Sequence, residues 1–244
     1  MTHLVFLHGV GGGRAAWARQ LPFFESRGYR CTAWEQPGYG SAPMVEPYDL
    51  ERVSSALADE IGSEPAVLVG HSMGGFIAQE TCARHPALVR ALALCFTSAS
   101  FGGNSGEFAR EFVAARILPL DQGGSMDDIA ATLMPMMRGA VSDPEGLALA
   151  RRTMAAVPPE TYRKAVRLLT TFDRRAGLES IAVPTLLLAG SDDRTAPAAV
   201  MERMAAKIPG ASYVLLPGCG HLGPMDQPEP FNAALLEFLQ RHRL

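Results

Sequence analysis

Residues 65–75 read P-A-V-L-V-G-H-S-M-G-G, and this stretch decides the fold. An apolar run of strand length ends at Gly70, and a helix-like stretch follows within a few residues. Glycines on both sides of Ser72, at two-residue spacing, are typical of a nucleophile elbow, a sharp turn from a strand into a helix. Side chains at positions 70 and 74 would collide with the backbone packed around that turn. The pattern and its flanks therefore favour an exposed Ser72 hydroxyl at a helix N-terminus over a chance glycine-serine turn.

Other short apolar runs also end in glycine or polar turns. They do not alternate apolar with polar residues, which indicates strands covered on both faces, as in a parallel sheet. Helical patterns lie between most of the runs, and alternating strands and helices predict an α/β doubly wound sheet. The further expected strands lie within residues 4–9, 31–38, 91–97, 185–190 and 212–218.

Two helices of the expected core have clear starts. Asp49 is a good N-cap for a helix whose apolar residues recur at helical spacing from Leu50 to Ile61. Pro228 stands near the start of a final helix over residues 228–241, which carries one apolar face. Both helices fit the alternation of strands and helices.

From about 98 to 178 the sequence has helical patterns and no convincing strand. We therefore expect an α/β core of residues 1–97 and 178–244, interrupted by a helical cap of residues 98–177. Helix signals stand at Ser125, at D-P-E over 143–145 and within 158–172, and glycine-rich linkers are expected at 102–106 and 122–125.

Composition narrows the class of protein. The chain has 244 residues, 48% hydrophobic and 19% charged, so one α/β domain with an insertion can bury a large core. A net charge of -3 does not suggest a nucleic-acid partner, and no apolar run reaches the ~20 residues of a membrane span. No basic signal-peptide segment opens the chain, and the cysteines lack C-x-x-C spacing, so a reduced cytoplasmic location is expected. The cysteines are Cys31, Cys82, Cys95 and Cys219.

A serine needs a base to act as a nucleophile, and the base needs an acid that orients it. Candidates for both follow predicted strands, so they lie at the same sheet edge as Ser72. The base is His221, in the loop after residues 212–218. Zinc binding at Cys219 and His221 is disfavoured because no second ligand pair has metal spacing.

The acid lies in S-D-D-R-T-A-P over 191–197, where two aspartates adjoin. The form G-x-x-D-x-x-x-P favours Asp193, which leaves Asp192 to cap or solvate the turn. Glu179 and Asp173 are remoter alternatives. His8 and His71 adjoin motifs and are interpreted as local hydrogen-bonding groups.

The glycine loop H-G-V-G-G-G over 8–13 has two interpretations. A dinucleotide loop is disfavoured, since Arg14 stands where G-x-G-x-x-G needs glycine and only Glu35 could supply the later acidic residue. Acyl transfer instead needs two N–H donors for an oxyanion. We expect these to be the backbone amides of Val10 and of Met73, the residue after the nucleophile.

Taken together, these motifs resemble the α/β-hydrolase superfamily, and more narrowly its small esterases, enol-lactonases and carbon–carbon bond hydrolases. The resemblance covers residues 4–97 and about 178–244. It implies an α/β-hydrolase fold with a nucleophile, acid and base at Ser72, Asp193 and His221. The motifs that carry it are H-G-V-G-G (8–12), W-E-Q-P-G-Y-G (34–40), G-H-S-M-G-G (70–75), G-S-D-D-R-T-A-P (190–197) and C-G-H (219–221).

The sequence departs from that family in several places. Glu35 stands where the family's turn usually has aspartate, and the opening antiparallel hairpin is expected to be missing, which leaves about six parallel strands. A serine nucleophile argues against haloalkane dehalogenase or epoxide hydrolase chemistry, and the H-G-G-P-G loop of proline iminopeptidases is absent.

The expected function is hydrolysis of a small carboxylic ester or lactone through an acyl-enzyme on Ser72, without a cofactor or metal. The alternatives are a carbon–carbon bond hydrolase of a diketone-type ring-cleavage product and a non-enzymatic ligand receptor on the same fold. The expected partner is a small-molecule substrate, and the protein is expected to be a monomer or homodimer.

The expected cap holds two groups of residues with a bearing on specificity. Methionines and phenylalanines could line an adaptable apolar pocket, or simply pack the helices, which is favoured for most of them. One arginine could bind a substrate carboxylate, but most are expected to be solvated and the sequence does not select one. The apolar group is Met126, Met134, Met136, Met137, Met154, Phe101, Phe108 and Phe112, and the arginines are Arg110, Arg116, Arg138, Arg151, Arg152, Arg163 and Arg167.

Overall fold

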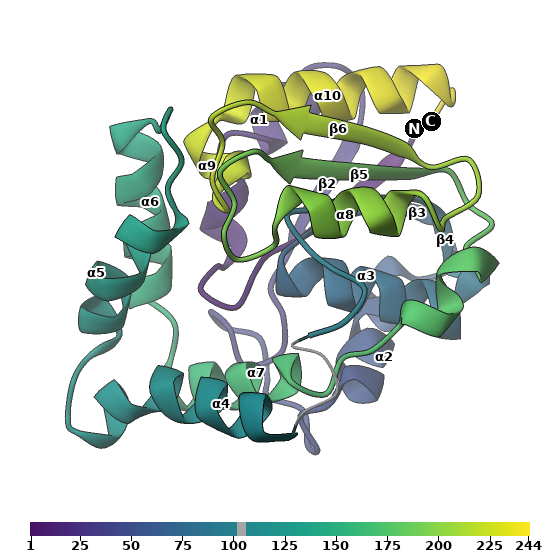
Figure 1. Ribbon diagram of the computed structural model, residues 1–244. Coiled ribbons are helices and arrows are strands. Elements are labelled where there is room, and N and C mark those ends of the chain that lie inside the picture. Colours follow the sequence, from purple (N-terminus) through teal and green to yellow (C-terminus); the bar gives the residue numbers. More distant parts are fainter. Residues whose placement is uncertain (102–105) are drawn as a thin grey trace.

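A six-stranded parallel sheet forms the centre of the molecule (Figure 1). The computed structural model describes residues 1–101 and 106–244. The strand order is β2-β1-β3-β4-β5-β6, so the prediction of about six parallel strands is confirmed. The strands are β1 (His3–Leu7), β2 (Arg30–Trp34), β3 (Ala66–His71), β4 (Val89–Cys95), β5 (Thr185–Gly190) and β6 (Ser212–Leu216).

Strand β3 lies inside the sheet, paired with β1 and β4, and every one of its residues is buried. This burial explains its unbroken apolar run, because neither face meets water. In the register, Gly70 lies beside Leu7 of β1 and Leu94 of β4. The end of β3 is therefore held from both sides at the point where Ser72 follows.

Helices cover both faces of the sheet, as predicted. Figure 1 shows α10 on one side of β5 and β6 and α8 on the other, and both helices contact these strands. Helix α3 packs against β3 and β4, and α2 packs on α3. The helices around the sheet are α1 (Leu21–Glu25), α2 (Leu50–Ile61), α3 (Met73–Arg84), α8 (Ala198–Ala205), α9 (Gly223–Asp226) and α10 (Pro228–Arg241), with short 3-10 helices at Arg14–Trp17, Pro86–Leu88 and Arg175–Ser180.

Four α-helices of the described chain, here called the inserted helices, lie between β4 and β5. Figure 1 shows α5 and α6 beside the ends toward which β5 and β6 point, with α4 and α7 running together below the sheet. Among the described residues of this segment, the only strand-like pairing is an isolated bridge between Ser100 and Asp173. The inserted helices are α4 (Gly106–Asp121), α5 (Met126–Met137), α6 (Pro144–Ala155) and α7 (Pro159–Leu169).

The predicted helix starts agree with the structure. The Asp49 carboxylate accepts the Arg52 amide N–H at 2.8 Å, and Ser125 forms a reciprocal capping box with Asp128. Asp143 caps α6, with Pro144 as the first helical residue. The linker expected at 102–106 lies outside the described residues, except that Gly106 begins α4. No helix in the described ranges is long and apolar enough to cross a membrane.

Candidate active site

Ser72 lies on a strained turn between β3 and α3. Its backbone has φ 54° and ψ -119°, the positive-φ conformation that side-chain-bearing residues rarely adopt. A Cβ on Gly70 would lie 2.5 Å from the carbonyl oxygen of Gly74, and one on Gly74 would overlap the carbonyl of Leu7. The two glycines are therefore required by backbone contacts, for the steric reason that the sequence pattern indicated.

Ser72, His221 and Asp193 form a continuous hydrogen-bonded series. The Ser72 Oγ lies 3.0 Å from Nε2 of His221, and Nδ1 of His221 lies 2.8 Å from Oδ2 of Asp193. His221 and Asp193 are both buried. Since Nδ1 donates its proton to the carboxylate, Nε2 is left to accept the Ser72 hydroxyl proton. The structure thus brings together three residues that the sequence places up to 149 positions apart.

The environment of Asp193 favours its charged form. Burial raises the pKa of this carboxyl, but the charge and hydrogen bond of His221 and two backbone amides outweigh burial, so the pKa is lowered overall. Oδ1 accepts the amides of Thr195 at 2.7 Å and Ala196 at 2.9 Å, while Oδ2 faces His221. The carboxylate is thereby fixed in both position and charge.

The other acidic candidates make different contacts. Asp192 accepts the Ala140 amide at 2.8 Å and the Ser191 hydroxyl at 2.9 Å, so it ties the turn to the segment between α5 and α6. Asp173 is exposed and pairs with Arg175 at 2.6 Å. Glu179 is exposed in a 3-10 helix. Neither of the last two is recorded in contact with His221.

The loop after β1 lies against Ser72. A Cβ on Gly9 would stand 3.1 Å from Cβ of Ser72, and Val10 lines the same cavity as the serine. The amides of Val10 and Met73 donate no recorded hydrogen bond within the described part of the chain. Two unpaired N–H groups beside a nucleophile are what a developing oxyanion requires.

Two hydrogen bonds that sequence analysis missed anchor the backbone carbonyls of Val10 and Ser72. The Tyr39 hydroxyl donates to the Val10 carbonyl at 2.8 Å, and the Thr97 hydroxyl donates to the Ser72 carbonyl at 2.8 Å. Tyr39 belongs to the quoted turn 34–40, which is the one sequence signal that could have drawn attention to it. Nothing in the sequence indicates the role of Thr97.

His71 and His8 are local hydrogen-bonding groups, as interpreted from the sequence. His71 donates through Nε2 to the His221 carbonyl at 2.7 Å, so it fixes the backbone of the loop that carries the expected base. Burial, with a smaller contribution from the charge of His221, lowers the pKa of His71 to about 3. His71 is therefore neutral at ordinary pH. His8 bonds the Gly9 carbonyl at 2.9 Å.

A cavity of about 640 Å³ opens at Ser72 and His221. Its walls come from the strand ends, the glycine loop and the inserted helices, so residues of the inserted helices share one cavity with Ser72. The predicted packing role holds for most of the eight methionine and phenylalanine residues, which belong to the hydrophobic core or pack against it. All of them except Met126 also line this cavity, so the two interpretations do not exclude each other. The lining members are Met134, Met136, Met137, Met154, Phe101, Phe108 and Phe112.

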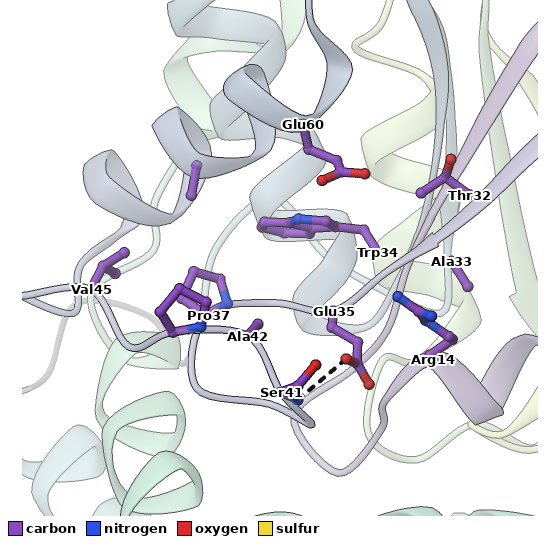
Figure 2. Close-up of a pocket in the computed structure, with 12 residues that line it drawn as sticks. Arg14, Thr32, Ala33, Trp34, Glu35, Pro37, Ser41, Ala42, Val45 and Glu60 are labelled. Atoms are coloured by element: carbon purple, nitrogen blue, oxygen red, sulfur yellow. Dashed lines mark hydrogen bonds between the residues drawn. The ribbon is translucent and has the colours of Figure 1, made fainter.

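A second cavity, of about 420 Å³, lies beside the edge strand β2. Figure 2 shows the indole of Trp34 below the carboxylate of Glu60, with Arg14 and Glu35 further down in the view. Glu35 accepts the Ser41 amide at 3.4 Å across the turn 35–41. No histidine is among the lining residues, so this cavity has no counterpart of the Ser72–His221 pair. Glu35, which stands where the family usually has aspartate, therefore has a structural role in holding this turn.

Within residues 1–101 and 106–244, no three His, Cys, Asp or Glu side chains gather in a way that could hold a metal ion. The thiol of Cys219 is buried, and burial raises its pKa to about 12. Its sulfur lies 3.5 Å from the Gly220 carbonyl. The Cys219–His221 stretch is thus occupied by local contacts and the bond to Asp193.

A parallel sheet that delivers a serine, a histidine and an aspartate to one edge defines the α/β-hydrolase class of fold. The chain belongs to the alpha/beta hydrolase family, whose model matches residues 4–234, and it is an α/β-fold hydrolase. It is 32% identical to the pimeloyl-[acyl-carrier protein] methyl ester esterase of Aromatoleum aromaticum, over 98% of both chains.

Two further similarities span the whole chain. The 2-hydroxy-6-oxononadienedioate/2-hydroxy-6-oxononatrienedioate hydrolase of Paraburkholderia phymatum is 30% identical, with 97% of this chain and 86% of that protein covered. The solved structure of the enol-lactonase from Burkholderia xenovorans has a TM-score of 0.86 at 25% identity, covering 98% of this chain and 91% of that one. Proteins similar to this chain thus act on more than one kind of bond.

Proposed function

We propose that this protein is a serine hydrolase that cleaves a small carboxylic ester or lactone through an acyl-enzyme on Ser72. The observation that carries the proposal is the hydrogen-bonded series Ser72–His221–Asp193, open to an apolar cavity. Such a series is the arrangement that makes a serine hydroxyl nucleophilic near neutral pH.

In the proposed mechanism, Ser72 Oγ attacks the substrate carbonyl carbon while its proton passes to Nε2 of His221. The amides of Val10 and Met73 hold the resulting oxyanion, and Asp193 stabilises the imidazolium. The carbon–oxygen bond to the leaving group then breaks, and His221 returns the proton to that oxygen. A water molecule, deprotonated by His221, attacks the acyl-enzyme in the same way and releases the carboxylic acid and free Ser72.

Two features of the geometry support the proposed oxyanion step. The amide of Met73 is at the N-terminus of α3, where no preceding helical carbonyl pairs with it and the helix dipole favours negative charge. The Tyr39 hydroxyl donates to the Val10 carbonyl and so anchors the loop that carries the Val10 amide. Preorganised donors of this kind typically contribute a factor of about 10²–10³ each to kcat.

The substrate class is supported by the names of similar proteins, which include a methyl ester esterase and an enol-lactonase. We further propose that residues 98–177 act as a cap whose inserted helices select the substrate. A cytoplasmic location is supported by four free cysteines, three of them buried, and the predicted monomer or homodimer stands as a proposal.

A carbon–carbon hydrolase is the second candidate, favoured by the similarity to the nonadienedioate hydrolase. It would use the same three residues on a vinylogous diketone. Parallel assays with esters, lactones and ring-cleavage diketones distinguish the two, because the ester proposal expects ester or lactone turnover to exceed diketone cleavage at equal concentration. A preference for the diketone would overturn it in favour of this candidate.

Labelling tests whether the site is enzymatic. A fluorophosphonate should modify the wild-type protein at Ser72, and p-nitrophenyl acetate should give a burst of p-nitrophenol equal to the enzyme concentration. Ser98→Ala is the matched control, since Ser98 lines the same cavity while its hydroxyl bonds the Ser100 carbonyl at 2.7 Å. Labelling that survives in Ser72→Ala, or a wild-type protein that neither labels nor bursts, would leave a ligand receptor as the better explanation.

A further inference from the structure

One arginine of the inserted helices differs from the others in its surroundings. Arg116, on α4, lines the cavity that contains Ser72 and is half-buried. Arg151 and Arg163 pair with carboxylates of Asp127 and Asp121. The remaining four are exposed and do not line the cavity: Arg110, Arg138, Arg152 and Arg167.

Arg116 has no carboxylate partner in the described part of the chain. No described acidic residue lies within the 4.0 Å of an ion pair with it, and the four residues outside the described ranges, 102–105, are Gly-Gly-Asn-Ser. Its recorded contact is with an aromatic ring, the guanidinium carbon lying 5.2 Å from the centroid of Phe112. A cation on a largely apolar wall is weakly screened, so an anion that reaches it is bound more strongly than at an open surface.

A second unpaired donor faces the same space from α7. Tyr162 is 1% exposed and lines the cavity, and its hydroxyl makes no recorded hydrogen bond within the described chain. Burial raises the pKa of Tyr162, while the charge of Arg116 acts in the opposite direction, so the two groups sense each other. The hydroxyl is protonated at ordinary pH and is available as a donor.

The cavity wall carries no negative charge to repel an anion. Among the described residues, the lining includes no Asp or Glu, and its only other arginine is Arg194, which is exposed in the loop after Asp193. Figure 1 shows that α4 and α7, which carry Arg116 and Tyr162, run together, and the two helices are in contact. Arg116 and Tyr162 therefore offer a guanidinium fork and a hydroxyl on one wall, while Ser72 stands elsewhere in the same cavity.

We infer that Arg116 and Tyr162 bind a carboxylate of the substrate, so that the enzyme prefers esters or lactones that carry a free carboxylate apart from the bond that is cleaved. The inference rests on the proposed function and names its substrate class. A guanidinium presents paired N–H donors that match the two oxygens of a carboxylate, and the phenol adds a third donor. Arg116 and Tyr162 are positioning residues in this scheme and take no part in bond cleavage.

The test uses paired substrates that differ only at the far end. Monomethyl esters of straight-chain dicarboxylic acids are compared with the methyl esters of the matching ω-amides, over a series of chain lengths. The wild-type protein should have the higher kcat/KM on the carboxylates, with a maximum at one chain length set by the span from Ser72 to Arg116. Equal or better turnover of the neutral amides would overturn the inference.

Variants assign the preference to residues. Arg116→Met should lower kcat/KM on the best carboxylate by about 10- to 100-fold, the effect of losing a charge-assisted hydrogen-bonded pair, and should leave the neutral amide within about 2-fold. Tyr162→Phe should lower the carboxylate value by about 3- to 10-fold. Arg110→Met, on the exposed part of the same helix, is the matched control and should behave as wild type. An equal loss on both substrates in Arg116→Met would contradict carboxylate binding.

A binding measurement separates this inference from the hydrolase proposal. In Ser72→Ala, which cannot turn over substrate, the best-fitting dicarboxylate should raise the melting temperature and its diamide should not, and Arg116→Met should abolish the shift. If the wild-type protein hydrolyses esters but the dicarboxylate gives no shift, the proposed function stands and the carboxylate inference is wrong. If the shift is seen but the wild-type protein is never labelled at Ser72, the carboxylate site stands and the serine-hydrolase proposal is wrong.

Discussion

The strand ends and the inserted helices build one cavity in opposite ways. At the strand ends, backbone contacts leave little freedom: Gly70 and Gly74 have no room for a Cβ, and His71 ties the His221 loop. The inserted helices instead meet the cavity through methionine and phenylalanine side chains, and are tied by exposed ion pairs such as Arg151–Asp127. The comparison teaches that backbone contacts fix the groups proposed to react, whereas adaptable side chains form the wall that is proposed to face the substrate.

The largest effect is expected from removing the nucleophile at the strand ends. Ser72→Ala should lower kcat on an ester by about four to six orders of magnitude, because the acyl-enzyme cannot form. Stopped-flow and steady-state rates measure the loss, and thermal unfolding checks that the fold persists. Near-normal turnover in this variant would show that Ser72 is not the nucleophile and that the strand ends do not hold the reacting groups.

The next effect contrasts neighbouring aspartates. Asp193→Asn should lower kcat by about three to four orders of magnitude, since the amide cannot hold the imidazole in the required tautomer or stabilise its charge. Asp192→Asn should change kcat by less than about 5-fold, because Asp192 bonds only the Ala140 amide and the Ser191 hydroxyl. Steady-state rates on one ester measure both losses. A larger loss in Asp192→Asn than in Asp193→Asn would show that Asp192, and not Asp193, is the acid.

The sequence predicted the strand ends far better than the wall. The elbow at Ser72 is a local steric pattern, and the helix starts at Asp49, Ser125 and Asp143 are local capping patterns, so a few adjacent residues suffice for each. The contact of His71 with the His221 carbonyl spans 150 positions and leaves no local trace. The same limit applies to Arg116, since what distinguishes it from other arginines is a missing partner, and only packing reveals that.

A buried glutamate that pairs with two partly exposed arginines should influence stability in acid. Glu80 of α3 bonds Arg84 and Arg174, the latter reaching it from the end of the insertion. Burial raises the pKa of Glu80, but hydrogen bonds from Arg174 and Arg84 outweigh it and lower the pKa below its ordinary 4.5. A depressed pKa means that the stabilisation is full above the unfolded value and is lost as pH falls through the folded one.

Glu80→Gln should therefore lower the free energy of unfolding by about 1–3 kcal/mol at pH 7, with the difference from wild type shrinking below about pH 4. Urea unfolding at several pH values measures this, with Glu237→Gln as the control because its pair with Arg241 is exposed. A difference that does not shrink in acid would mean that the loss comes from packing and owes nothing to the charge.

The smallest expected effect compares the inserted helices with the strands directly, through one substitution of similar volume in each. Met134→Leu on α5 and Leu68→Met in β3 both exchange side chains of similar volume, so each should change stability by less than about 1.5 kcal/mol. Met134 lines the cavity and Leu68 does not, so only Met134→Leu should shift relative kcat/KM along a series of ester chain lengths, by about 2- to 5-fold. Because Leu68 is fully buried in β3, two residues before Gly70, its swap also asks whether a small change in the core reaches the reacting groups. If Leu68→Met altered the chain-length preference as much as Met134→Leu, the wall would not be the part that selects the substrate.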